Sequence, residues 1–549
     1  MKIKNMMNKL SVGLLSAALL ATSVTGTLAS VSAMSVDELP EARFEVDPTV
    51  PSWQKDTETP ASLKWYVNFD WYAQPGWGVD TVTKKIKEDM NIDVEFISGN
   101  DENLNTMLAG GDLPDLMTFD KNLSVAAEAD KFALPLNILA ETYDPYFLAE
   151  AAKQETLQWY TKEDGNIYGY PSFSATALDY EEGNIFGDQV FIVRQDIYEA
   201  IGSPDMTTPE GFLQALRDAK AHMPQSDDGA ELVAFGSTAV DIANGGDGAW
   251  GGILQDFLNL APTVDGQMND RDSSEEYITW LEVLRQAYSE GFITDDQFSD
   301  NDNTMKEKLG QGRYFAYLHT NTKGLNEFMS DNNARNPEQT YIAVDGPKNS
   351  NGDTSTFSGG NIGGWTNTFI TTSTEEPQKA MELLTYLASE YGTMVATFGV
   401  EGETYNLVDG QVEYSEETEA LRNSDIARFD KEIGLGSYWF VLDDNYAIEM
   451  GQKPATSIRQ MVEWAADKVA PRFETEDVNP TTGSEGRSLT QLNIARVQAL
   501  AAYIQAPSAE EGRQIWDDFL ASRENFGYSQ ILDYQNSKIA ENIQKLSAE

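Results

Sequence analysis

The fold is decided by residues 61–120, which read ASLKWYVNFDWYAQPGWGVDTVTKKIKEDMNIDVEFISGNDENLNTMLAGGDLPDLMTFD. The apolar run at 63–67 predicts a strand. Apolar and polar residues alternate over 92–96, which indicates a second strand, because neighbouring side chains of a strand point to opposite faces. A third apolar run begins at 116–117. The stretch therefore contains three predicted strands in 60 residues.

Helices are predicted between these strands. Asp80 can cap a helix over 81–89, because its carboxylate can accept a free backbone N–H at the helix start. Apolar residues over 104–108 have helical spacing, and the pair Gly110-Gly111 ends that helix. The order strand–helix–strand–helix–strand is typical of an α/β protein with a mostly parallel sheet.

A second structural unit begins with the apolar run at 190–193, which predicts another strand. Its first long helix starts at Thr208-Pro209-Glu210, where Thr caps, Pro occupies the first turn and Glu complements the helix dipole. Another helix is predicted through 277–288. Residues 345–368, rich in Gly, Asn, Ser and Thr, indicate a connection, and the last ~130 residues are mainly helical in pattern.

The N-terminus has the pattern of a secretory signal peptide. Three lysines lie in the first ten residues, and the apolar stretch at 10–21 is too short to span a bilayer comfortably. Residues 31–33 fit a small-x-small cleavage site, so we expect 1–33 to be a signal peptide. Residues 34–60 carry four prolines among polar residues and are predicted to be an extended leader. We therefore expect an extracytoplasmic protein, secreted or associated with the cell surface.

Composition excludes several kinds of function. The 549 residues include 38 basic and 89 acidic side chains, giving a formal net charge of −51, which repels nucleic acid. With no cysteine, the chain has no disulfide, thiol nucleophile, Cys-ligated zinc or lipid-modified N-terminal cysteine. Only two histidines are present, and the acidic cluster at 295–303 lacks the glycine of a calcium-binding hand. We therefore predict no metal, no cofactor and no nucleic-acid partner.

Aromatic residues in loops are the candidates for ligand binding. They are Trp71 and Trp77 after the first strand, Trp250 and Trp365 beside glycines, and Trp439. Ligands of open α/β sheets bind in loops beyond the carboxyl ends of strands, and aromatic faces stack on sugar rings. Asp120 follows a strand end, where its carboxylate can bond sugar hydroxyls. The alternative for each Trp is a place in the core.

Four motifs occur in one order along the chain, at 107–115 (MLAGGDLPD), 166–171 (NIYGYP), 192–212 and 398–405 (FGVEGETY). In these segments the sequence resembles the extracellular solute-binding proteins of bacterial ABC importers, family 1. It is most similar to the subgroup around LplA-type and alginate-oligosaccharide-binding proteins.

The resemblance implies a type II periplasmic-binding-protein-like α/β fold, with a ligand cleft between two lobes joined by a multi-strand hinge. It implies discontinuous lobes, with 61–185 and 355–402 forming lobe 1 and 186–354 and 403–549 forming lobe 2. Glu401 and Tyr405, in the last motif, become ligand candidates beside the hinge. The segment 225–231, where some relatives bind calcium, is short and poor in ligands here.

The resemblance also implies a function. We expect a non-enzymatic, monomeric protein that captures a carbohydrate, in particular an oligosaccharide, and delivers it to the permease subunits of an ABC importer. Two alternatives stay open: the same fold binding a peptide or another non-sugar solute, and a secreted carbohydrate-active enzyme. The enzyme would need two carboxylates facing each other at roughly 5–10 Å across the cleft.

Overall fold

A computed structural model describes residues 34–73, 76–226, 228–335 and 337–547. The signal peptide predicted for 1–33 lies outside these residues. Within the described ranges, no helix combines the length and the apolar character needed to cross a bilayer.

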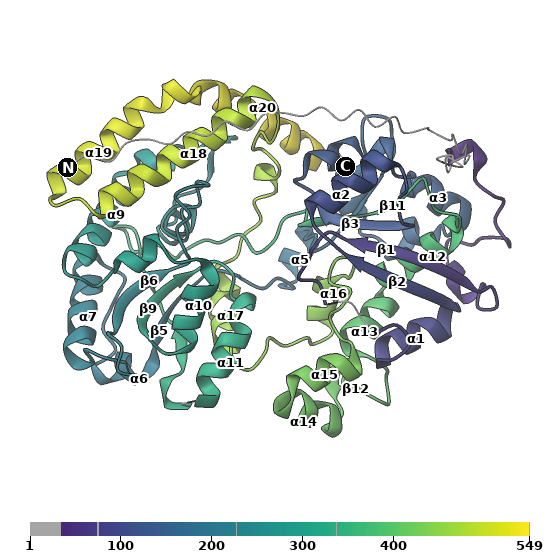
Figure 1. Cartoon of the computed structure of the whole chain (residues 1–549), viewed down its shortest axis with the longest axis horizontal. Coiled ribbons are helices and arrows are strands. Elements are labelled where there is room, and N and C mark those ends of the chain that lie inside the picture. Colours follow the sequence, from purple (N-terminus) through teal and green to yellow (C-terminus); the bar gives the residue numbers. More distant parts are fainter. Residues whose placement is uncertain (1–33, 74–75, 227, 336, 548–549) are drawn as a thin grey trace, which may run out of the picture. The chain divides into compact units, whose positions relative to one another are not determined.

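The first sheet is built mainly from residues 61–120, which contain three of its strands. Its strand order is β2-β1-β3-β11-β4 (Figure 1). β1 pairs in parallel with both β2 and β3, which confirms the predicted parallel set. β11 runs antiparallel to β3 and to β4, so the end of the predicted connection 345–368 is in fact the start of a strand. The bounds are β1 (Ala61–Val67), β2 (Ile92–Ser98), β3 (Leu116–Asp120), β4 (Tyr170–Pro171) and β11 (Thr366–Ile370).

The helices between these strands begin and end where the sequence predicts. Asp80 caps α1 (Thr81–Met90), and its carboxylate accepts the backbone N–H of Thr83 at 2.7 Å. α2 (Asp101–Gly110) ends at Gly111, whose φ of 72° is a left-handed value that glycine adopts without strain. The remaining helices associated with this sheet are α3 (Leu136–Tyr143), α4 (Gln154–Tyr160), α5 (Ala177–Glu181), α12 (Pro377–Ala388) and α13 (Glu390–Phe398).

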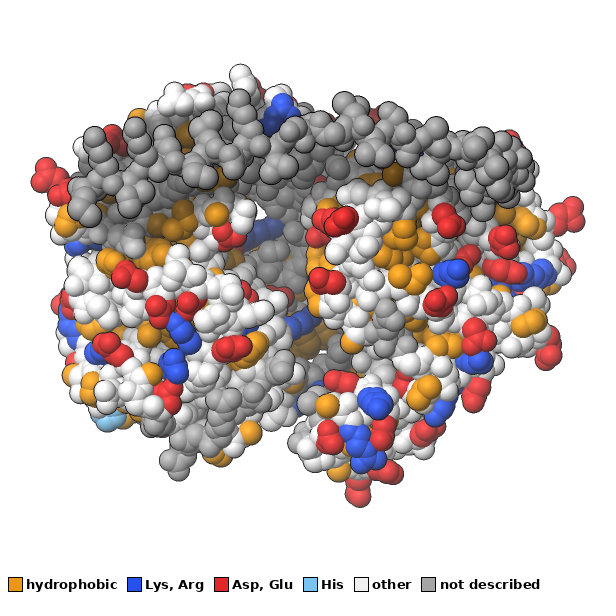
Figure 2. Space-filling model, viewed as in Figure 1, with side chains coloured by type: hydrophobic (Ala, Val, Ile, Leu, Met, Phe, Trp, Pro, Cys, Tyr) orange, Lys and Arg blue, Asp and Glu red, His pale blue; other side chains and the backbone are white. Residues whose placement is uncertain are grey.

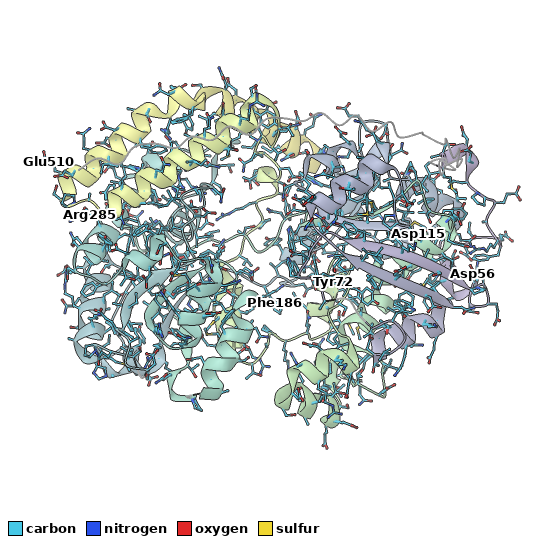
Figure 3. All side chains as sticks on the ribbon, in the orientation of Figure 1. Asp56, Tyr72, Asp115, Phe186, Arg285 and Glu510 are labelled. Atoms are coloured by element: carbon cyan, nitrogen blue, oxygen red, sulfur yellow. The ribbon has the colours of Figure 1, made fainter. Side chains whose placement is uncertain are left out.

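The loop that contains Thr374 precedes α12 and contacts the first sheet. Pro377 occupies the first turn of α12, and Glu376 is its cap residue. The hydroxyl of Thr374 donates to Asp115 at 2.7 Å, and Asp115 also accepts the backbone N–H of Lys64 (Figure 3). Thr374 therefore connects this loop to the sheet, and α13 forms a separate helix after Ala388.

The core of the first sheet includes residues from distant parts of the chain. Trp65 and Val67 of β1 and Leu384 of α12 are fully buried in one cluster. The same cluster contains the buried residues Tyr438, Phe440, Val441 and Leu442. The segment 438–442 therefore packs with the first sheet. In the sequence, α14 (Glu416–Ser424) and α15 (Ile426–Ile433) precede this segment, and α16 (Asp444–Glu449) follows it.

The second sheet has the strand order β10-β5-β9-β6 (Figure 1). β5 is antiparallel to β9 and β10, whereas β6 is parallel to β9. Thr208 caps α7 as predicted, and its hydroxyl accepts the backbone N–H of Gly211. The strands are β5 (Val190–Arg194), β6 (Val233–Ser237), β9 (Tyr314–His319) and β10 (Tyr341–Ala343). The helices are α6 (Gln195–Ala200), α7 (Pro209–His222), α8 (Gly252–Phe257), α9 (Glu275–Ser289), α10 (Asp302–Gly310), α11 (Asn326–Arg335) and α17 (Arg459–Ala465).

The C-terminal part of the chain is helical, as predicted. Its helices are α18 (Gly483–Ile504), α19 (Ala509–Ser522) and α20 (Tyr528–Leu546), drawn in yellow-green to yellow in Figure 1. Trp516 and Leu500 join the core that also holds Trp280 of α9. Arg496 of α18 forms ion pairs with Asp272 at 2.7 Å and Asp247 at 2.6 Å, so charge as well as apolar packing connects α18 to the second sheet's core.

Two short hairpins complete the structure, β7 (Thr263–Val264) with β8 (Gln267–Met268) and β12 (Tyr405–Val408) with β13 (Gln411–Tyr414). The predicted leader 34–60 contacts the first sheet's unit. Tyr143 donates to the carbonyl of Pro40, and Asp144 accepts the backbone N–H of Ser52. Trp53 is buried in the first core. The segment is therefore held by specific contacts along its length.

Candidate functional site

Four of the eight predicted site residues come together at one edge of the first sheet. The indole planes of Trp71, Trp365 and Trp439 are almost parallel, at 8° to 17° to one another. Their ring centroids are 5.0 Å (Trp365–Trp439), 5.8 Å (Trp71–Trp439) and 6.4 Å (Trp71–Trp365) apart. Asp120 joins them through a hydrogen bond from the Trp365 Nε1–H at 3.0 Å.

Trp365 is held by backbone bonds as well as by Asp120. Its N–H donates to the carbonyl of Ser172, and its own carbonyl accepts the N–H of Lys121. Gly364, with a φ of 60°, precedes it, and a Cβ at this position would collide with the Ser172 carbonyl. Two chain segments approach each other closely at Gly364, and only glycine leaves room for this approach. The contact fixes the position of the Trp365 backbone, from which the indole extends.

Trp71 lies in the loop that follows β1, and 59% of its surface is exposed. This loop and the start of α2 line a hollow of about 350 Å³, with Asn68, Phe69 and Trp71 on one side and 99–102 on the other. β1 and β2 are parallel, so their carboxyl ends meet at this edge of the sheet. This is the edge where open α/β sheets bind ligands.

Trp439 is placed by its neighbours. Tyr438 and Phe440 are fully buried in the first core, whereas Trp439 is half-buried. The hydroxyl of Tyr72 donates to the carbonyl of Ser437, which connects the Trp71 loop to the Trp439 segment (Tyr72 is labelled in Figure 3). Burial raises the pKa of the Tyr72 hydroxyl strongly, so it stays a neutral donor.

Two further rings belong to the site and were not predicted from the sequence. The ring centroid of Phe69 lies 5.0 to 5.7 Å from the ring centroids of Trp71, Trp365 and Trp439. Phe173 lies 5.8 Å from Trp439 with its plane at 10°. We call these five residues, Phe69, Trp71, Phe173, Trp365 and Trp439, the aromatic cluster.

Phe173 has a strained backbone. Its φ is 53°, in the left-handed region that a bulky side chain adopts only when the surrounding structure enforces it. Strain of this kind is concentrated at binding sites. The signal in the sequence was the motif at 166–171, which ends two residues earlier. For Phe69 the signal was its place directly after β1.

The other four predicted site residues lie elsewhere. Trp77 donates its Nε1–H to the carbonyl of Ile92 and packs 6.4 Å from Phe96. Trp250 is completely buried in the core of the second sheet, because it packs on Phe235 and Phe298. Neither indole contacts the aromatic cluster.

Glu401 and Tyr405 form a turn between α13 and the hairpin β12–β13. They share a β-bridge, and the Gly402 N–H donates to the Tyr405 carbonyl. Tyr405 is buried against Phe398, and burial together with the charge of Glu401 raises its pKa to about 12. The motif at 398–405 therefore shapes a chain turn, and neither side chain contacts the aromatic cluster.

Two lysines lie near the aromatic cluster. Lys121 follows Asp120 and forms ion pairs with Glu476 and with Asp477. Burial alone would lower the Lys121 pKa, but the two carboxylates outweigh it and raise it, so Lys121 stays charged. Lys323 lies 5.7 Å from the centroid of the Phe173 ring, within reach of a cation–π contact.

The two histidines belong to elements of the second sheet's unit, His319 to β9 and His222 to α7. Among the described residues, no group of three or more His, Asp or Glu side chains could hold a metal ion. His319 is buried at the end of β9, and burial lowers its pKa to about 4, so it is neutral at physiological pH. His222 lies in the last turn of α7.

A larger hollow, of about 620 Å³, lies between α7, α9 and the α18–α19 region. Both arginines of its lining are already paired, Arg217 with Glu290 and Arg513 with Glu275. It contains one aromatic ring, Tyr503. The hollow beside Trp71 therefore combines more of the features of a ligand site, although it is smaller.

Solved structures resemble this chain over almost their whole length. The alginate-binding protein AlgQ2 has a TM-score of 0.59 at 17% identity, covering 88% of this chain and 99% of its own. An HMO-binding, ABC-transporter-associated solute-binding protein from Bifidobacterium longum infantis has a TM-score of 0.61 at 14% identity, covering 88% and 99%. The Streptococcus pneumoniae substrate-binding protein FusA, in complex with kestose, has a TM-score of 0.59 at 16% identity, covering 87% and 99%.

At these identities the likeness establishes the fold. No protein-family model matches the sequence, and a search of curated proteins found no match. The predicted type II periplasmic-binding-protein-like α/β fold is confirmed. The domain boundaries given above stay a prediction.

Proposed function

We propose that this protein is an extracytoplasmic solute-binding protein that captures an oligosaccharide and delivers it to the permease subunits of an ABC importer. The aromatic cluster at the carboxyl edge of the first sheet is the observation that carries the proposal. The indoles are near-parallel, Trp71 is exposed, and Trp365 and Trp439 are half-buried, so aromatic surface is available to the C–H faces of sugar rings.

The polar neighbours suit the same ligand. Asp101, which is exposed, lines the hollow beside Trp71, where a sugar hydroxyl can donate to its carboxylate. Structures with this fold include proteins described as binding alginate, HMO and kestose. Import follows in such a protein from closure of the two lobes around the ligand, because a ligand that contacts both lobes favours the closed state. We propose that the protein acts as a monomer and performs no chemistry on its cargo.

Calorimetry of the purified chain from Met34 onward with a panel of oligosaccharides tests the proposal. We expect saturable binding of at least one glycan, quenching or enhancement of tryptophan fluorescence, and recovery of the glycan intact by chromatography. Trp71→Ala should abolish the response, whereas Trp77→Ala, in the same loop but outside the aromatic cluster, should retain it. Cleavage of the glycan would refute the non-enzymatic function, and binding of peptides alone would refute the sugar ligand.

A further inference from the structure

The hollow beside Trp71 is lined with unpaired carboxylates. Its lining includes Asp70, Asp101 and Glu102, all exposed, next to Phe69 and Trp71. Asp101 accepts a hydrogen bond from the Asn68 side chain at 2.7 Å. None of these three carboxylates is paired with a lysine or arginine in the described part of the chain. The hollow therefore carries a concentrated negative charge on the side open to a ligand. On the face drawn in Figure 2, acidic side chains are interspersed with basic ones.

The start of α2 does not supply a free anion site. A helix N-terminus carries a partial positive charge, which would attract an anionic ligand. Here Asp101 and Glu102 occupy the first turn, and the Asn100 side chain accepts the backbone N–H groups of Glu102 and Asn103. These side chains offset the positive end of the helix dipole and accept the free backbone N–H groups. Neither is therefore available to an anionic ligand.

The nearby lysines are also compensated. Lys121 is paired with two carboxylates, Glu476 and Asp477, so that group has a net negative charge. Burial raises the pKa of the carboxyls of the half-buried Asp188 and Asp444, and the nearby charge of Lys323, beside Phe173, acts to lower both. A carboxylate on a ligand would therefore meet little uncompensated positive charge at this site.

From this charge distribution we infer that the site takes uncharged oligosaccharides and rejects the same oligosaccharides when they carry carboxylates. The inference rests on the proposed function and narrows its ligand class. A sugar hydroxyl donates to Asp70, Asp101 or Glu102, whereas a uronate at the same place meets like charge. Like charges a few ångströms apart repel even in water, and they repel more strongly when they are partly shielded from it.

The test uses matched pairs of glycans. The full chain is screened against an array of neutral oligosaccharides, and against the same oligosaccharides oxidised at C6 to uronates. We expect binding in the neutral set, and at least tenfold weaker binding of the oxidised partner of each neutral glycan that binds. Equal or tighter binding of an oxidised partner would overturn the inference while leaving the proposed function intact. Binding of neither set would overturn the proposed function, and the inference with it.

Variants then ask whether these carboxylates cause the rejection. In Asp70→Asn/Glu102→Gln we expect the neutral-to-oxidised affinity ratio to fall by about fivefold to thirtyfold, because two of the three repelling charges are gone. The matched control, Glu463→Gln/Asp533→Asn, removes two exposed charges from α17 and α20 and should leave the ratio unchanged. An unchanged ratio in the first variant, or an equal fall in the control, would show that the local carboxylates are not responsible.

Discussion

The tryptophans in the core of the second sheet and those at the edge of the first sheet differ in exposure, although several look alike in the sequence. Trp250, Trp280 and Trp516, around the second sheet, are at most 1% exposed. Trp71 and its partners Trp365 and Trp439, at the edge of the first sheet, are exposed or half-buried. Trp250 and Trp365 both lie beside glycines. A neighbouring glycine therefore does not determine whether an indole is exposed. The exposure of the indole depends on where it lies relative to a strand end and to the surrounding helices.

The largest expected effect is the loss of stability when a buried tryptophan is replaced. Trp250→Ala should lower the free energy of unfolding by about 3–5 kcal/mol, because it leaves a large cavity under Phe235 and Phe298. Urea denaturation measures the loss. Trp250→Phe, which keeps a ring and removes an Nε1–H that has no partner in the described structure, should lose clearly less. Equal losses would mean that packing does not hold this indole.

Substitution of an exposed tryptophan should lower the affinity for the ligand and leave the free energy of unfolding almost unchanged. Trp71→Ala removes a side chain that is 59% exposed, so we expect its unfolding free energy to change by less than about 1 kcal/mol. Its affinity for the oligosaccharide should fall by about 2 kcal/mol or more, as for a central aromatic anchor. Calorimetry and urea denaturation of the same preparation separate the two effects. A variant that loses stability but binds normally would contradict the assignment of Trp71 to the site.

The two cores also differ in their buried charges. In the first, Glu382 is fully buried, and burial raises its pKa to about 7 in spite of Lys379 at 3.4 Å. In the second, burial would raise the Asp272 pKa, but the charge of Arg496 outweighs it and lowers it. Ionised Glu382 therefore destabilises its core, and ionised Asp272 stabilises its own.

This difference predicts opposite pH dependences. Between the usual Glu pKa of 4.5 and about 7, the folded protein holds the Glu382 proton more tightly than the unfolded chain does, so this group makes stability fall as pH rises. Glu382→Gln should remove that fall, gaining about 1–3 kcal/mol over the wild type between pH 4.5 and 7.5. Asp272 acts in the other direction, because its contribution is lost only as pH falls below the usual Asp pKa of 3.8.

Denaturation midpoints measured across this pH range check the prediction. Glu375→Gln, an exposed neighbour just before α12, is the matched control and should track the wild type. A Glu382→Gln curve parallel to that of the wild type would show that Glu382 is ionised in both states.

The smallest effect concerns the orientation of one indole. Asp120→Ala removes the acceptor of the Trp365 Nε1–H, a bond whose net worth is about 1–2 kcal/mol. We expect affinity to fall about threefold to tenfold, and the tryptophan emission maximum to shift as the indole changes its surroundings. Asp120→Asn keeps a carbonyl acceptor and should restore most of the affinity. A fall of the same size in both variants would indicate that the charge of Asp120, and not the hydrogen bond, matters.

Much of the first sheet was predictable from local signals. Asp80, the alternation over 92–96 and the glycines at 110–111 each act through neighbours in the chain, so the sequence alone carries them. The strand β11 was missed as a sheet member because its partners, β3 and β4, are about 200 residues away or more. Antiparallel pairing over such a distance leaves no periodic signal of its own.

Only four of the eight residues predicted for the candidate site lie together, because local sequence signals do not show how a side chain packs in three dimensions. Trp71, Asp120, Trp365 and Trp439 could be chosen as aromatic or polar residues near strand ends or in glycine-rich loops. The same argument selected Trp77 and Trp250, which packing removes from the site. Phe173 was missed because its distinguishing feature is a φ of 53°, which appears only in three dimensions.

The aromatic cluster draws its rings from four stretches of chain, 69–71, 173, 365 and 439, and the last two are separated from the first by about 300 residues or more. A chain that has emerged only as far as residue 400 has its first three strands but lacks Trp439. The complete aromatic cluster can therefore form only once the chain extends past residue 439. Retention on an immobilised oligosaccharide would separate finished molecules from truncated or partly folded ones.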